Sequence, residues 1–96
     1  HKRKKNPMKL LIKGAEAALP TGSGTASNFD KATVVRLVNT ATNADHLVTI
    51  VDIPGGSVIG SFTLMRSESV LVEKQFAHYI FAANAAVKGS KVGYTN

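Results

Sequence analysis

The residues best suited to chemistry in this 96-residue chain are a histidine and two nearby carboxylates. His46 follows Asp45 directly, and Asp52 lies on the same segment. Imidazole and carboxylate groups can bind zinc or other divalent metals, but no recognised ligand spacing is present here. We therefore predict that Asp45, His46 and Asp52 hold no metal and that His46 is a polar surface residue.

Nucleophilic catalysis has little support in the sequence. The chain has no cysteine, and no Gly-x-Ser-x-Gly elbow occurs. Glu68 and Glu73 could form a carboxylate pair, but their odd spacing would place them on opposite faces of one strand. We expect a protein without catalytic residues or cofactor.

Neither a phosphate loop nor an RNA-binding sheet is indicated. The segment TGSG at residues 21–24 lacks the Lys-Ser/Thr ending of a phosphate-binding loop. The six aromatic residues do not form the motif of an RNA-binding sheet, and the basic residues of the main part of the chain are scattered. These observations favour a structural or binding protein.

The net charge of +6 comes mainly from the start of the chain. Four of the twelve basic residues stand together there: Lys2, Arg3, Lys4 and Lys5. From Met8 onward, eight basic and six acidic residues leave 8 − 6 = +2. Residues 1–7 could be a basic arm that contacts a polyanion or another partner. They could equally be a vector remnant or an upstream extension, with Met8 the natural start.

Short segments rich in β-forming residues recur about every ten residues, a spacing typical of antiparallel sandwiches and barrels. The predicted strands are residues 33–39, 46–53, 57–64, 68–75, 78–83 and 86–94, with a further candidate at 8–13. We predict an all-β, single-domain antiparallel β-sandwich of six to seven strands over residues 8–96, immunoglobulin-like or jelly-roll-like. Because the connections are too short for βαβ crossovers, each turn is expected to join antiparallel neighbours.

Residues 14–28 read as a flexible loop that contributes little to the core. Several strands have apolar residues on both faces. Val48, Ile50 and Leu71 are therefore candidates for a subunit interface. The alternative for this apolar surface is that part of it lies beneath the loop. A small core without disulfides makes a homo-oligomer plausible, and no apolar run reaches the ~20 residues of a membrane span.

Residues 34–95 resemble small virion structural proteins of tailed bacteriophages, especially those of the marine, cyanophage type. The matching positions are Val38-Asn39, Val48-Thr49-Ile50, Ile59-Gly60-Ser61, Thr63-Leu64, Glu68-Ser69, Val72, Lys74 and Val92-Gly93-Tyr94-Thr95. The chain departs from that pattern at Met65-Arg66-Ser67 and at Phe76-Ala77-His78.

The resemblance implies a viral structural protein located in the virion, such as a capsid decoration or a neck- or tail-associated subunit. Its partners would be further copies of itself and other virion proteins. It implies no catalytic residues and no membrane, and nucleic acid would be touched only nonspecifically by the basic arm. A stand-alone β-sandwich module that binds carbohydrate or nucleic acid is the alternative.

Overall fold

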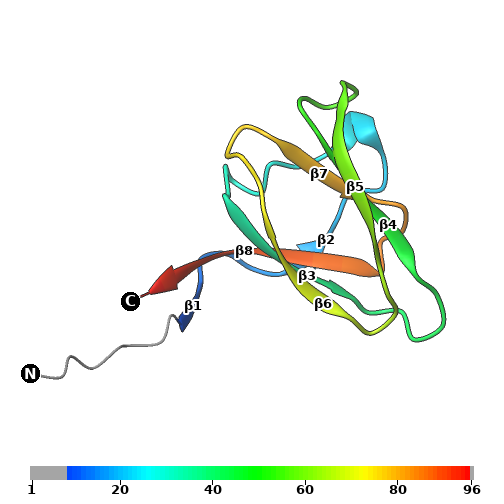
Figure 1. Cartoon of the computed structure of the whole chain (residues 1–96), viewed down its shortest axis with the longest axis horizontal. Coiled ribbons are helices and arrows are strands. Elements are labelled where there is room, and N and C mark those ends of the chain that lie inside the picture. Colours follow the sequence, from blue (N-terminus) through cyan, green and yellow to red (C-terminus); the bar gives the residue numbers. More distant parts are fainter. Residues whose placement is uncertain (1–8, 96) are drawn as a thin grey trace, which may run out of the picture.

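The computed structural model describes residues 9–95, which form a nearly all-β structure (Figure 1). Its elements are β1 (Lys9–Ile12), β2 (Ala17–Ala18), the 3-10 turn η1 (Ser23–Thr25), β3 (Val34–Asn39), β4 (His46–Val51), β5 (Val58–Leu64), β6 (Ser69–Glu73), β7 (Tyr79–Ala82) and β8 (Val87–Thr95). Within this part of the chain, no helix is long and apolar enough to cross a membrane.

Two antiparallel sheets make up the sandwich, which confirms the predicted fold class. The larger sheet has the order β1-β8-β3-β6, and β2 pairs with β8 as its fifth strand. The smaller sheet has the order β5-β4-β7. The two-residue β2 brings the described strands to eight, one more than the upper limit expected.

The prediction that each turn joins antiparallel neighbours is wrong for most of the connections. Only β4 and β5 are consecutive strands that pair as a hairpin. The chain changes sheet between β3 and β4 and again between β5 and β6, β6 and β7, and β7 and β8. A short connection can do this because stacked sheets lie only about 10 Å apart.

The core lies between the two sheets, and it includes residues that the sequence placed elsewhere. Val48 is fully buried, and Ile50 packs against the core cluster. Both face inward because they pair with Ala82 and Ile80 of β7, which are themselves buried. The prediction of a subunit interface is therefore wrong for these two residues. Leu71 is 43% exposed on β6, so its assignment stays a prediction.

Residues 14–28 contribute more to the core than predicted. They contain β2 and η1, and Leu19 belongs to the core cluster with 2% exposure. Its backbone N–H donates to Val87 O at 2.9 Å, which anchors the segment to β8. A single large side chain among small residues was not recognised as a core residue from the sequence.

Gly89 on β8 provides a test of this packing. A Cβ atom there would lie 2.8 Å from Leu37 Cδ2, 3.0 Å from Leu19 Cδ1 and 3.1 Å from Phe29 Cζ. We expect Gly89→Ala to lower the free energy of unfolding by about 1–3 kcal/mol, the usual cost of overpacking a core. Urea denaturation would measure it.

Gly60 on β5 is the matched control, because a Cβ atom there would meet nothing within 4 Å. Gly60→Ala should change the free energy of unfolding by less than about 1 kcal/mol. Equal destabilisation by the two substitutions would contradict the packing described around β8.

Candidate functional site

The residues considered for a metal site lie apart. Asp45 precedes β4 and Asp52 follows it, so about 20 Å of strand separates them. The Asp45 carboxylate accepts hydrogen bonds from the side-chain Nε of Arg66 at 3.1 Å and from its backbone N–H at 2.9 Å. These bonds lower the pKa of Asp45. Asp52 accepts the backbone N–H groups of Ile53 and Ser57 and so closes the β4–β5 turn.

These contacts account for both carboxylates as structural groups. His46 begins β4 beside Asp45 and is half-buried. Among residues 9–95, no three histidine, cysteine, aspartate or glutamate side chains gather in a metal-binding arrangement. The basic residues Lys2, Arg3, Lys4 and Lys5 lie outside the described residues.

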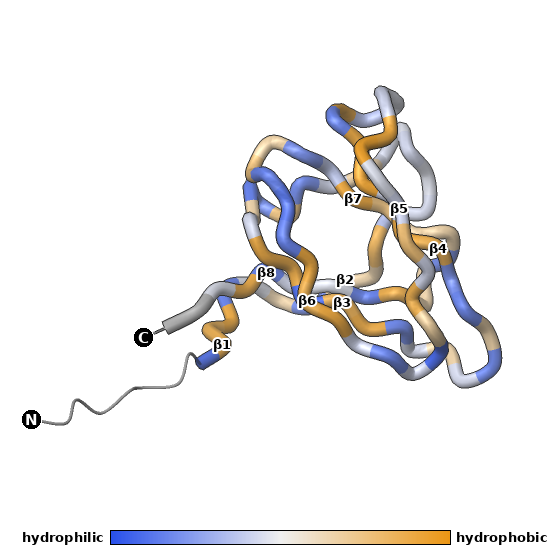
Figure 2. The backbone as a smooth tube through the Cα atoms, in the orientation of Figure 1, coloured by the Kyte–Doolittle hydropathy of each residue, from blue (hydrophilic) through white to orange (hydrophobic). Residues whose placement is uncertain are grey.

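A two-stranded ribbon projects from the sandwich. β1 pairs with the C-terminal part of β8, and the two strands extend side by side away from the rest of the molecule (Figure 1). β1 is apolar along most of its length (Figure 2), yet Leu10, Leu11 and Ile12 are 41%, 43% and 73% exposed. The second sheet does not cover this part of the larger sheet.

The two faces of the ribbon differ in character. Lys9 and Leu11 share the inner face, which continues the side of the sheet that lines the core, and Lys13 follows them with the same alternation. Lys13 donates its backbone N–H to Lys91 O, and a Cβ atom at Gly93 would lie 2.8 Å from Lys13 Cε. Lys13 therefore lies across β8 on this face.

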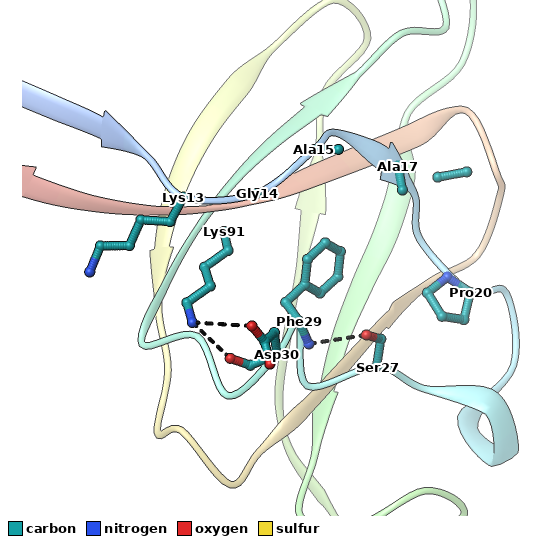
Figure 3. Close-up of a pocket in the computed structure, with 10 residues that line it drawn as sticks. Lys13, Gly14, Ala15, Ala17, Pro20, Ser27, Phe29, Asp30 and Lys91 are labelled. Carbon is teal, nitrogen blue, oxygen red and sulfur yellow. Dashed lines mark hydrogen bonds and ion pairs between the residues drawn. The ribbon is translucent and has the colours of Figure 1, made fainter.

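A pocket of about 360 Å³ opens on the same side of the sheet, where the ribbon meets the sandwich. Its apolar wall comes from small residues around β2 and from an aromatic ring, and its polar groups come from β8 and a turn. Its lining is Lys13, Gly14, Ala15, Ala17, Ala18, Pro20, Ser27, Phe29, Asp30 and Lys91 (Figure 3).

The turn beside the pocket has an unusual backbone. Phe29, Asp30 and Lys31 have φ angles of 52°, 54° and 58°, so three successive non-glycine residues are left-handed. This conformation costs on the order of 1–2 kcal/mol per residue. The N–H of Ala32 bonds Asn28 O and Phe29 O, both at 3.1 Å, and closes the turn.

Two lysines stabilise the carbonyl groups of this turn. Lys91 Nζ donates to Asp30 O at 2.9 Å and lies 3.6 Å from Asp30 Oδ2 (Figure 3). Lys74 Nζ donates to Ala32 O at 2.7 Å and to His78 O at 2.9 Å. Phe29 packs against the core cluster. Packing and charge together offset the local strain.

The outer face of the larger sheet contains a second hollow of about 440 Å³. We call it the outer groove, and its lining is Leu10, Ile12, Gly14, Ala15, Glu16, Arg36, Ser90 and Val92. Arg36 and Glu16 form an ion pair at 3.8 Å, with both side chains about 40% exposed. Leu71 pairs with Arg36 in the register of β3 and β6 and extends this face.

The two hollows are suited to binding. The pocket combines an apolar wall with lysine ammonium groups, and its ten lining residues include neither histidine nor cysteine. Ser27 Oγ accepts the Phe29 N–H at 3.0 Å, which holds the serine hydroxyl against the turn. The outer groove combines apolar side chains with one ion pair, a composition common at protein interfaces.

Comparison with protein-family models, with curated proteins and with solved structures finds no match.

Sequence reasoning did not find the lysines of the inner face. Lys9, Lys13 and Lys91 looked scattered because Lys91 is far from the other two along the chain. The alternation of Lys9, Leu11 and Lys13 was the available signal, since it places both lysines on one face of a strand. Pairing of β1 with β8 brings the third lysine, Lys91, to the same face.

Proposed function

We propose that this protein is a non-enzymatic virion structural subunit that acts through protein–protein contacts, either as a capsid decoration or at the neck or tail. The outer groove is the observation that carries the proposal. It leaves Leu10 and Ile12 exposed on β1, and Leu71 is exposed on the same face of the sheet, on β6. Exposed apolar surface of this kind often marks a site of protein association.

A second copy of the chain is the partner that the groove fits best. In a two-fold symmetric interface the same patch meets itself, so charges must be matched within the patch. Arg36 and Glu16 provide one charge of each sign at the groove. Rotation about a two-fold axis can place Arg36 of one copy against the other copy's Glu16, with apolar side chains around them.

The virion setting is supported by the sequence resemblance. The motif residues Glu68-Ser69 and Val92-Gly93 lie in or beside β6 and β8, which border the strands of the groove. The genes beside the one encoding this chain would test the setting directly. Head and tail genes on both sides would support it, and a metabolic operon would contradict it.

The association itself is tested with the variant Ile12→Ser/Leu71→Ser, which removes one apolar side chain from the groove and a second from the same face of the sheet. We expect the wild-type mass to rise with concentration in sedimentation-velocity experiments and the double variant to remain monomeric. Loss of apolar contact at the centre of an interface typically weakens binding by more than about tenfold.

Ile53→Ser is the control, because Ile53 is also exposed, at 59%, but lies at the β4–β5 turn, away from the groove. Its association should equal that of the wild type. A wild-type chain that stays monomeric at high concentration and binds no purified head or tail protein would refute the proposal.

A further inference from the structure

The basic residues of the folded chain are unevenly distributed. None of β4, β5 and β7, which form the smaller sheet, contains a lysine or an arginine. The larger sheet contains Lys9, Arg36, Lys88 and Lys91, and Lys13 directly follows β1. The net positive charge of residues 9–95 is therefore concentrated on one sheet.

Three of these lysines gather on the inner face of the ribbon. Lys9 and Lys13 alternate with Leu11, and both side chains are exposed. Lys91 lies on the strand paired with β1, and its side chain is 28% exposed. Asp30 is the acidic residue in contact with this group, through Lys91, and its side chain is 93% exposed. We call Lys9, Lys13 and Lys91 the lysine face.

The sequence contains four further basic residues shortly before β1. Three residues lie between Lys5 and Lys9 in the sequence, so covalent geometry limits the distance between their Cα atoms to about 14 Å. The other three basic residues stand at positions 2–4 of the sequence and lie outside the described residues. The three folded lysines are therefore the basis of the proposal, and the experiment separates their contribution from that of residues 2–5.

We propose that the lysine face binds the phosphate backbone of a nucleic acid without regard to sequence. Lysines spaced at i and i+4 on a strand lie about 13 Å apart, far enough for the two ammonium groups to contact different phosphates of one nucleic-acid strand. Phosphate contacts by lysine position a protein and release counterions but do not read bases. This partner is distinct from the protein partner proposed for the outer groove, which lies on the opposite face of the same ribbon.

The experiment measures fluorescence anisotropy of labelled oligothymidylate and of a duplex of equal length over a series of KCl concentrations. A background in which Lys2, Arg3, Lys4 and Lys5 are glutamine isolates the folded lysines. We expect salt-dependent binding to persist in this background. Binding to either nucleic acid would support the proposal, and the ratio of the two affinities identifies whether the single strand or the duplex is preferred.

In that background, Lys9→Gln/Lys13→Gln should flatten the slope of log K against log[KCl] by about 1.4 for the single strand. The single variants Lys13→Gln and Lys88→Gln form a matched pair, because each removes one positive charge. Lys88 is paired in register with Ala18 and Val38 and lies on the outer face, away from the lysine face. The slope of log K against log[KCl] for Lys88→Gln should stay near that of the background. Asp30→Asn should tighten binding, and asparagine tolerates the left-handed backbone.

Two outcomes would overturn the proposal. One is complete loss of binding when only residues 2–5 are neutralised. The other is equal displacement by polyglutamate and by unlabelled nucleic acid at matched charge, which would show a general preference for polyanions such as acidic protein segments.

Discussion

Replacing Asn39 with alanine is expected to lower the free energy of unfolding by about 3 kcal/mol, since three buried or half-buried hydrogen bonds are lost together. Asn39 is fully buried at the end of β3. Its Nδ2 donates to Leu64 O and to Ala44 O, both at 3.0 Å. Its Oδ1 accepts the N–H of Ala41 at 3.0 Å.

The effect should be large because one side chain joins three segments. Asn39 links the end of β3 to the loop before β4 and to the end of β5. Its backbone also bonds the β5–β6 turn through Glu68 O and the Ser67 N–H. Alanine would leave the Leu64 carbonyl buried without this donor, and an unsatisfied buried group typically costs about 1–3 kcal/mol.

Thermal unfolding followed by circular dichroism measures the result. For a domain of this size, 3 kcal/mol corresponds to a fall in Tm of more than about 10 °C. Asn43→Ala is the control, because Asn43 is exposed in the β3–β4 turn, and it should shift stability by less than about 0.5 kcal/mol. Equal midpoints for the two variants would contradict the proposed role of Asn39.

The stability of the wild-type protein is expected to rise as the pH increases from about 8 to 10, because Lys74 is buried. Lys74 is 7% exposed, and its Nζ contacts three backbone carbonyl groups but no carboxylate among residues 9–95. Burial, helped by the nearby charge of Lys91, lowers the pKa of Lys74 from 10.5 to about 8.

The sign follows from proton binding in the two states. Below pH 8 the lysine is protonated in both the folded and the unfolded chain. Between pH 8 and 10.5 the folded chain releases this proton while the unfolded chain keeps it. The unfolded state then binds more protons, so raising the pH favours folding. Across the whole window the gain is at most roughly 3 kcal/mol, since each pKa unit corresponds to about 1.4 kcal/mol.

Urea denaturation at pH 7, 8, 9 and 10 tests this expectation. The wild-type midpoint should increase over the upper part of the series, and Lys74→Met should abolish that increase. Lys88→Met is the control, because Lys88 is exposed on β8, and it should keep the wild-type trend. A Lys74→Met profile parallel to that of the wild type would mean that this lysine does not titrate with folding.

The fold class and most of the strand positions could be predicted from the amino-acid sequence. Alternating and β-branched residues separated by turn clusters predicted β3 to β8, and the structure has a strand in each of the predicted segments. Such patterns are local, because a strand exposes successive side chains to opposite faces wherever it lies. On β6 this alternation turns Val70 and Val72 to one side, and both pack against the core.

The buried face of β4 could not be predicted in this way, because it depends on the strands that pair with β4. Apolar residues occupy both of its faces, so alternation alone could not choose between them. Pairing with β5 and β7 turns Val48 and Ile50 inward and leaves Leu47 46% exposed. A register shift between Ile50 and Val51 then brings Val51 to full burial as well. The choice depends on partners that are distant in sequence.

The same reason explains why the candidate sites were missed. The outer groove, the pocket and the lysine face each combine residues from opposite ends of the chain, brought together when β8 pairs with β1, β2 and β3. Strand pairing of this kind joins residues that are far apart in the sequence, so composition cannot show which residues come together. Lys91 next to Asp30 and Arg36 next to Glu16 are therefore features of the folded sheet, although each residue was visible from the start.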